Sequence, residues 1–149
     1  MKVSVFPCGL LETNCYIIED ENTAVVIDPG YKQRGIDEWL NSNSKKVKAI
    51  FLTHLHADHI AYLADVEAVT GAPVYIHEID NKYLFNSEYN MSSRLGRMYE
   101  IKTTKNKPIS VNDKQKIKVG NLEFTVIHTP GHTEGSCCYF IDNSLFSGD

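Results

Sequence analysis

Four side chains that can bind a metal ion occur within six positions of this chain. The segment Thr53-His54-Leu55-His56-Ala57-Asp58-His59 contains three of the six histidines of the sequence. It follows a mostly apolar run, residues 47–53, that has the composition of a buried strand. Imidazole and carboxylate ligands suit zinc, iron or manganese. We therefore predict a metal site where this strand gives way to a loop, the end of a strand at which open α/β sheets place their ligands.

Two later segments carry the same kinds of ligand at the ends of further predicted strands. His132 lies in the turn-forming run His128-Thr129-Pro130-Gly131-His132-Thr133, and Asp149 closes Ser147-Gly148-Asp149. Each segment is weak evidence when taken alone. Together with residues 54–59 they make three strand-end loops with suitable ligands, and such loops can assemble one shared site.

The elements that must position these loops alternate between strands and helices, which favours a layered α/β domain. Apolar spacing predicts three helices, near residues 36–40, from Asp58 to Thr70, and over 78–85. In the second helix, Ala68 and Val69 are expected on the apolar face and Gly71 as the C-cap. Residues 86–107 resist assignment and suggest a lid, an interface or a mobile connection. The predicted strands are 3–6, 15–19, 24–28, 47–53, 73–77, 116–119, 122–128, 137–141 and 145–147.

Composition sets limits on the class of protein. The chain has 149 residues, of which 42% are hydrophobic, so we expect one domain covering 1–149. No apolar run is long enough to span a bilayer or to act as a secretory signal, so we expect a cytoplasmic protein. Its four cysteines show no C-x-x-C spacing, and we expect buried thiols rather than disulfides.

Charge is distributed unevenly along the chain. The net charge is −4, but residues 91–120 carry eight lysines and arginines against Glu100 and Asp113. Such a segment suits an anionic partner or a solvated surface, and the sequence leaves both open.

The order H-x-H-x-D-H, then H-T-P-G-H-T, then S-G-D resembles the metallo-β-lactamase superfamily, especially its glyoxalase II-like hydrolases. The resemblance runs from about residue 3 to residue 149 and implies an αββα sandwich. It implies one metal ion on His54, His56 and His132. A second would be held by Asp58 and His59, and Asp149 would bridge the two. Zinc is the expected metal, two ions per complete site, with iron or manganese as alternatives.

The resemblance also implies a reaction. A metal-bound hydroxide, oriented by Asp58 as a catalytic residue, would attack a small-molecule thioester or acyl ester. The Ser-Gly-Asp segment argues against a true β-lactamase, because the family usually places cysteine or serine at the last of these positions. Three rivals stay open: a persulfide dioxygenase-like oxidoreductase with one iron ion, a nuclease supported only by residues 91–120, and a metal-binding fragment without turnover. Overall acidity makes nucleic acid an unlikely partner.

The third rival follows from the end of the sequence. Family members add another histidine and further elements beyond the position of Asp149, so we expect this chain to be incomplete at its C-terminus, with part of the second αβ half missing. Strands without their neighbours leave exposed edges, which predicts homo-oligomers.

Three further residues could support the site without binding metal. His77 fits a helix start better than a ligand, and His128 is expected to pack or form hydrogen bonds near its turn. Asp28, followed by Pro29 and Gly30, could orient a ligand imidazole or cap the end of its strand.

Overall fold

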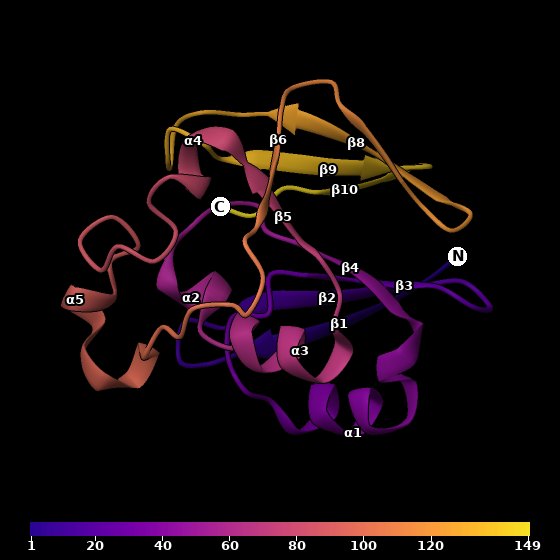
Figure 1. Ribbon diagram of the computed structural model, residues 1–149, viewed down its shortest axis with the longest axis horizontal. Coiled ribbons are helices and arrows are strands. Elements are labelled where there is room, and N and C mark those ends of the chain that lie inside the picture. The colour runs from indigo at the N-terminus through magenta and orange to yellow at the C-terminus, as the bar shows by residue number, and fades with distance from the viewer.

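The protein consists of two sheets packed face to face, with helices on the outer side of one of them. The computed structural model describes residues 1–149, except for the side chain of Arg97, so that member of the basic segment lies outside the described residues. Figure 1 shows helices α1 (Arg34–Asn43) and α3 (Leu63–Thr70) beneath the larger sheet and the smaller sheet above it. None of the described helices is long and apolar enough to cross a membrane.

The larger sheet has six strands in the order of the chain, from β1 to β6. The first two pairings are antiparallel, whereas β3, β4, β5 and β6 run parallel to one another. The carboxyl ends of the parallel strands therefore meet at one edge of the sheet. The strands are β1 (Lys2–Cys8), β2 (Thr13–Glu19), β3 (Ala24–Ile27), β4 (Val47–Phe51), β5 (Val74–His77) and β6 (Ile109–Val111).

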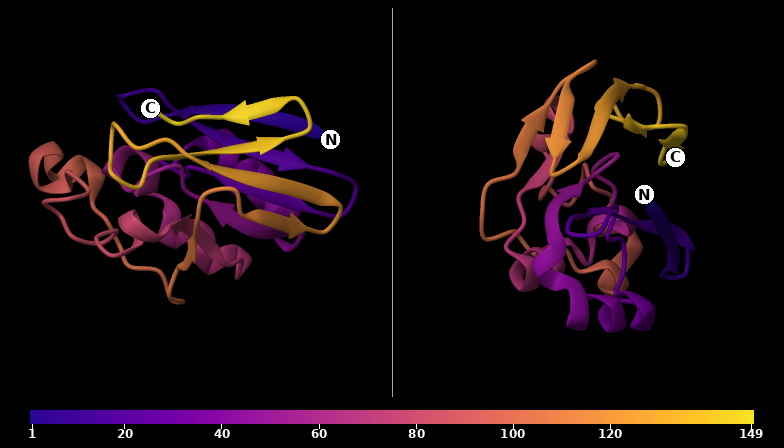
Figure 2. Two further views of the ribbon diagram at one scale, coloured as in Figure 1. Left: turned by 90° about the horizontal axis from the view of Figure 1, so that it is seen from above. Right: turned by 90° about the vertical axis from the view of Figure 1, so that its right-hand side faces the viewer.

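The smaller sheet has four antiparallel strands in the order β10, β9, β8, β7. Its two predicted hairpins are confirmed, with turns at Gly120-Asn121 and Asp142-Asn143. The right-hand view of Figure 2 shows this sheet stacked on the larger one. The strands are β7 (Lys116–Val119), β8 (Leu122–His128), β9 (Cys137–Ile141) and β10 (Ser144–Phe146).

Two separate cores hold these layers together. The first lies between the larger sheet and the helices, and Ile36, Leu63 and Val66 fill it from the helical side. The second lies between the two sheets, where Phe51 stacks on Tyr139 with ring centroids 4.6 Å apart. These layers confirm the predicted α/β sandwich architecture.

The helix predicted over residues 58–70 is wrong as a single element. The structure has a short helix α2 (Ala57–Ile60), a break, and then α3. At the break, the backbone N–H of Tyr62 donates to the carbonyl of Pro29, 3.0 Å away, instead of continuing the helical ladder. Ala68 and Val69 are exposed rather than part of the apolar face. The C-cap at Gly71 is confirmed by its left-handed backbone.

The segment 86–107 contains a short helix α5 (Ser92–Leu95) and a 3₁₀ turn η2 (Gly96–Tyr99). The buried Glu67 anchors the end of this segment, because its carboxylate accepts from the backbone N–H groups of Lys105 and Asn106 at 3.1 and 3.2 Å.

Two further elements differ from prediction. The helix expected over 78–85 is only α4 (Glu78–Asn81), and β6 was missed. A 3₁₀ turn η1 (Ser44–Lys46) also follows α1.

The outer face of the smaller sheet carries exposed apolar side chains, Ile127, Phe140 and Leu145. Nothing in the structure tests the predicted homo-oligomer, which stays a prediction.

Candidate metal centre

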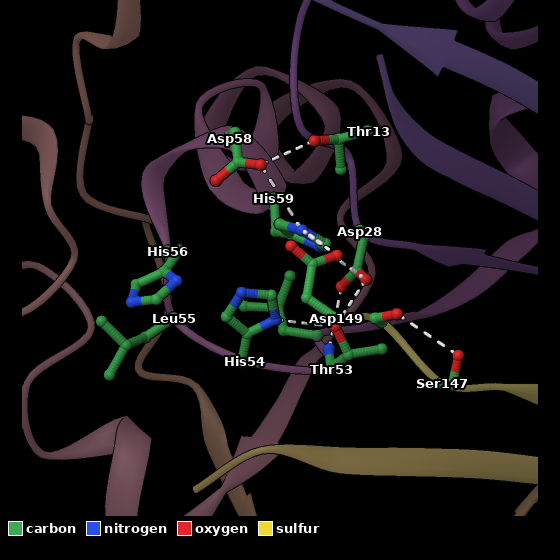
Figure 3. A network of polar contacts seen from close by, with 12 residues as sticks. Thr13, Asp28, Thr53, His54, Leu55, His56, Asp58, His59, Ser147 and Asp149 are labelled. Atoms are coloured by element: carbon green, nitrogen blue, oxygen red, sulfur yellow. Dashed lines mark hydrogen bonds and ion pairs between the residues drawn. The ribbon is translucent and has the colours of Figure 1, made fainter. Parts of the chain in front are cut away.

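The predicted ligands come together at the edge where the parallel strands end. Asp28 follows β3, residues 52–56 follow β4 and lead into α2, and His132 lies in the loop between β8 and β9. Asp149 follows β10, and Figure 1 shows the C-terminal end of the chain beside α2. Loops from both sheets therefore contribute to one cluster (Figure 3).

The first group consists of His54, His56 and His132. One ring nitrogen from each lies within 4.8 Å of the other two. Nδ1 of His56 and Nε2 of His132 are only 2.7 Å apart, although the residues are 76 positions apart in sequence. This is the set that the resemblance implies for one metal ion.

The second group shares His54 and adds His59 and Asp149, again with donor atoms within 4.8 Å of one another. Oδ1 of Asp149 is 3.4 Å from Nε2 of His59, and its Oδ2 is 3.9 Å from Nε2 of His132. Asp149 thus reaches toward both groups, as a bridging ligand would. Asp58 lies beside this group, with Oδ2 3.5 Å from Nε2 of His59.

Asp58 is held by a residue that the sequence did not single out. Its Oδ2 accepts a hydrogen bond of 2.6 Å from the hydroxyl of Thr13, at the start of β2. The two residues are 45 positions apart, so no local pattern connects them. This bond fixes the carboxylate at the rim of the cluster (Figure 3).

The buried Asp28 orients His59. Its Oδ2 lies 2.9 Å from Nδ1 of His59, and its two oxygens also accept from the backbone N–H and the hydroxyl of Thr53 at 2.8 and 2.6 Å. A proton on Nδ1 facing this carboxylate leaves the lone pair of Nε2 directed at the cluster. Asp28 therefore holds the ring of His59 in place, which matches the first of the two roles that the sequence left open.

The residues present fit a metal ion. Nε2 of His54 and Nε2 of His59 are buried without a hydrogen-bond partner among the described residues. A buried polar atom without a partner is costly, and a divalent cation would satisfy both nitrogens. A set of imidazoles and carboxylates is a common zinc or iron environment.

The pKa values of three of these histidines shift, and not all in the same direction. Burial, followed by repulsion from the neighbouring histidines, holds the pKa of His54 far below its usual range, and burial and His132 lower the pKa of His56. Burial opposes the charge on His59 as well, but the carboxylates of Asp28, Asp58 and Asp149 outweigh it and raise its pKa. His54 and His56 are therefore neutral and ready to bind a cation near neutral pH.

Close packing brings Asp149 to the cluster. Gly148 has a φ of +64°, and a Cβ there would lie 2.4 Å from the hydroxyl oxygen of Thr53. Only glycine allows the last loop to cross Thr53 at this distance. The backbone N–H of Cys137 donates to the Thr53 carbonyl at 2.9 Å and ties the two sheets together at the same point.

Asp80, a second residue missed from the sequence, joins two of the ligand loops. This buried carboxylate follows β5 and accepts from the backbone N–H of Leu55 at 3.1 Å and from the hydroxyl of Thr133 at 2.8 Å. It also accepts from the N–H of Gly135, where a Cβ would lie 2.4 Å from its oxygen. Its position in α4, directly after the parallel strand β5, was the available signal.

The two remaining histidines lie outside both groups. His77 forms the N-cap of α4, and Nε2 of His128 donates to the carbonyl of Glu134, 2.9 Å away. Their rings stack with centroids 4.0 Å apart. The predictions for both are confirmed, as is the prediction that all four cysteines are free and buried.

Comparison with known proteins identifies the family. The profile described as "Metallo-beta-lactamase superfamily" matches residues 8–149. The chain belongs to the metallo-β-lactamase superfamily. An uncharacterized protein of Mycobacterium leprae is 32% identical over 95% of this chain and 67% of its own length. The probable metallo-hydrolase YqgX of Bacillus subtilis is 29% identical over the whole chain and 71% of its own length.

Solved structures agree with this assignment. The B3 metallo-β-lactamase BLEG-1 superposes with a TM-score of 0.81 at 34% identity, over 94% of this chain and 67% of that one. TTHA1623, solved in a di-iron-bound form, gives a TM-score of 0.75 at 26% identity, over 92% of this chain and 66% of that one.

Proposed function

We propose that this superfamily member is a metal-dependent hydrolase of thioesters or small acyl esters, similar to glyoxalase II. The proposal rests on the convergence of five side chains from three separate loops, namely His54, His56, His59, His132 and Asp149. Two of their buried imidazole nitrogens have no hydrogen-bond partner among the described residues. The likeness to a probable metallo-hydrolase supports the same class of reaction.

Each residue has a defined part in this proposal. His54, His56 and His132 would hold one ion, and His59 with Asp58 the other, with Asp149 between them. When bound, two divalent ions supply a water of lowered pKa and stabilise the charge that develops on the carbonyl oxygen. Asp58, fixed by Thr13, accepts a proton or hydrogen bond from the attacking water and so orients it. Zinc is the proposed metal.

Hydrolysis by zinc-loaded protein tests this proposal. We expect release of thiol or phenol from an S-acyl glutathione or from 4-nitrophenyl acetate, and loss of at least 100-fold in kcat/KM in His54→Ala or His132→Ala. His128→Gln is the matched control, because His128 lies outside both groups and should retain activity. Equal activity in the His54→Ala variant would refute the assignment.

An iron-dependent oxidoreductase is the second candidate. His54, His59 and Asp149 form a group of two histidines and one carboxylate, the ligand set of many non-haem iron oxygenases. Metal analysis with oxygen-electrode measurements separates the candidates. One iron per chain with oxygen consumption on a persulfide would favour this alternative, and two zinc ions with hydrolysis would favour the first.

The likeness to BLEG-1 favours one more substrate for the same chemistry, the strained amide of a β-lactam. Nitrocefin hydrolysis by the zinc-loaded protein measures it directly. Turnover of nitrocefin far above that of the esters would assign the site to β-lactams.

A further inference from the structure

Among the candidate ligands in residues 54–59, His56 differs in how its ring is held. The other three each have a polar contact with a residue outside the proposed ligand set. The supporting residues are Thr53 for His54, Thr13 for Asp58 and Asp28 for His59. Within the described part of the chain, the ring of His56 has its only polar contact with His132, which is itself a proposed ligand. The position of His56 therefore depends on its main chain.

The main chain next to His56 is tied to a distant segment by a hydrogen bond. The backbone N–H of Ala57 donates to the carbonyl of Asn90 at 2.8 Å. Ala57 is the first residue of α2, and the first N–H groups of a helix have no partner within the helix. His56 is the N-cap, but its side chain forms no capping hydrogen bond, which leaves the ring available to a metal ion. Asn90 thus supplies a partner that the helix itself lacks.

The side chain of Asn90 holds this carbonyl in place. Asn90 is completely buried, and its amide group donates to the carbonyl of Leu84 at 2.9 Å and accepts from the backbone N–H of Ser92 at 3.0 Å. Met91, which lies between Asn90 and Ser92, has a φ of +66°, a left-handed conformation that is uncommon for methionine. The two hydrogen bonds of the amide therefore maintain a turn that the local sequence does not favour.

The same turn borders a cavity beside the metal centre. Tyr89 precedes Asn90 and lines a cavity of about 490 Å³ together with His56 and His132. Its ring stacks on the ring of Tyr83, with centroids 4.1 Å apart. A displacement of this turn would move His56 and one wall of the cavity together.

From these contacts we propose that Asn90 is a positioning residue that places His56 for the metal ion through the Ala57 N–H. The inference rests on the proposed metal centre but not on the identity of the substrate. In Asn90→Ala both hydrogen bonds of the amide are lost, so the carbonyl is free to move away from Ala57. His56 should then bind metal less well, whereas Asp58 and His59 keep their own supporting side chains.

Zinc titration of the full chain against a chromophoric chelator tests this role. In Asn90→Ala the ion of the first group should bind about tenfold more weakly, and the ion of the second group should be weakened less. His132→Ala, which lacks a ligand of the first group, identifies the zinc equivalent that belongs to that group. A variant that is only destabilised would lose affinity at both ions alike.

Two further variants separate positioning from the loss of an amide. Asn43→Ala is the matched control and should bind both ions as the parent does, because its amide also donates to a main-chain carbonyl, that of Trp39 at 2.9 Å, but lies at the end of α1. In Asn90→Ser the hydroxyl can still accept from the Ser92 N–H, so its affinity for the first ion should lie between those of the parent and Asn90→Ala.

Hydrogen exchange of the Ala57 amide in metal-free parent protein gives a measurement that does not depend on the folding of a variant. We expect this amide to be protected at least about 100-fold. An unprotected Ala57 amide, an unchanged affinity for the first ion in Asn90→Ala, or equal weakening of both ions would each overturn the inference. If the affinities follow the predicted order but no ester is cleaved, only the proposed hydrolysis fails.

Discussion

Replacing Asp28 with asparagine changes one oxygen of a buried carboxylate into an amide nitrogen with almost no change in volume. In the parent, one oxygen of Asp28 faces both Nδ1 of His59 at 2.9 Å and the hydroxyl of Thr53 at 2.6 Å. The other accepts from the Thr53 backbone N–H at 2.8 Å. An asparagine that keeps this last bond turns its NH₂ group toward His59.

The consequence is a change of tautomer. With an N–H donor facing it, Nδ1 of His59 becomes the acceptor, and the proton moves to Nε2, the atom that faces the cluster. Loss of such a supporting carboxylate weakens metal binding about 10- to 100-fold, or about 1.4–2.7 kcal/mol. We expect the loss at the ion next to His59. The ion on His54, His56 and His132 should be weakened less, because only His54 of these three is connected to Asp28, through the Thr53 hydroxyl that lies 3.1 Å from its Nδ1.

Competition between the protein and a chromophoric chelator measures the two zinc equivalents separately. Asp113→Asn is the control, since it makes the same chemical change at a carboxylate outside the cluster, which accepts from the His128 N–H and pairs with Lys114 at 4.0 Å. Circular dichroism should show that both variants are folded. If Asp28→Asn binds both equivalents as tightly as the parent, Asp28 does not orient His59 toward a metal ion.

Four further predictions follow from individual contacts. Asp80→Asn should weaken the ion on His54, His56 and His132 about tenfold in the same titration, and unchanged affinity would contradict the role of Asp80 in joining two ligand loops. In metal-free protein, the pKa of His54 is lower in the folded state than in the unfolded chain, so the unfolded chain binds more protons below pH 6.5. The unfolding free energy should therefore fall as the pH drops from 7 to 5, by up to about 1.4 kcal/mol per pH unit. His54→Gln should flatten this slope in urea titrations, and an equal slope would exclude His54 as its source. Gly148→Ala should lower the unfolding free energy by about 1–3 kcal/mol, because the added Cβ meets Thr53. Gly131→Ala is the control and should cost little, because open space surrounds Gly131. Equal urea midpoints for the two variants would contradict the close packing of Gly148 on Thr53. Burial raises the pKa of Cys137 to about 12, so iodoacetamide at pH 8 should leave this thiol unlabelled in native protein. Labelling of Cys137 as fast as in urea would show that the core between the two sheets opens.

The part of the site that is local in sequence could be predicted, and the part built by long-range packing could not. His54, His56, Asp58 and His59 lie close together in the stretch from the end of β4 through helix α2, so their types and spacing indicate a shared centre. His132 and Asp149 were weak candidates from their strand-end positions alone, and the resemblance to a family assigned them to the same site, because no spacing rule connects them to residues 54–59. Their convergence depends on how the two sheets stack.

Thr13 and Asp80 were missed for the same reason. Each forms its decisive hydrogen bonds with residues at least 25 positions away, namely Asp58, Leu55 and Thr133. Side-chain patterns along the chain do not encode such pairs.

Secondary structure failed where tertiary contacts override local preference. The apolar spacing of residues 58–70 favours one helix, but Tyr62 gives its N–H to Pro29 and breaks it. Strand β6 has only three residues and exists through its pairing with β5. By contrast, the hairpins and the Gly71 cap depend on neighbouring residues, and the sequence predicts them correctly.

Anomalous diffraction from crystals of zinc-loaded protein tests the central claim most directly. The account predicts one zinc peak among the rings of His54, His56 and His132 and a second between His59 and Asp149. Zinc peaks elsewhere on the molecule, with none at these five side chains, would contradict it.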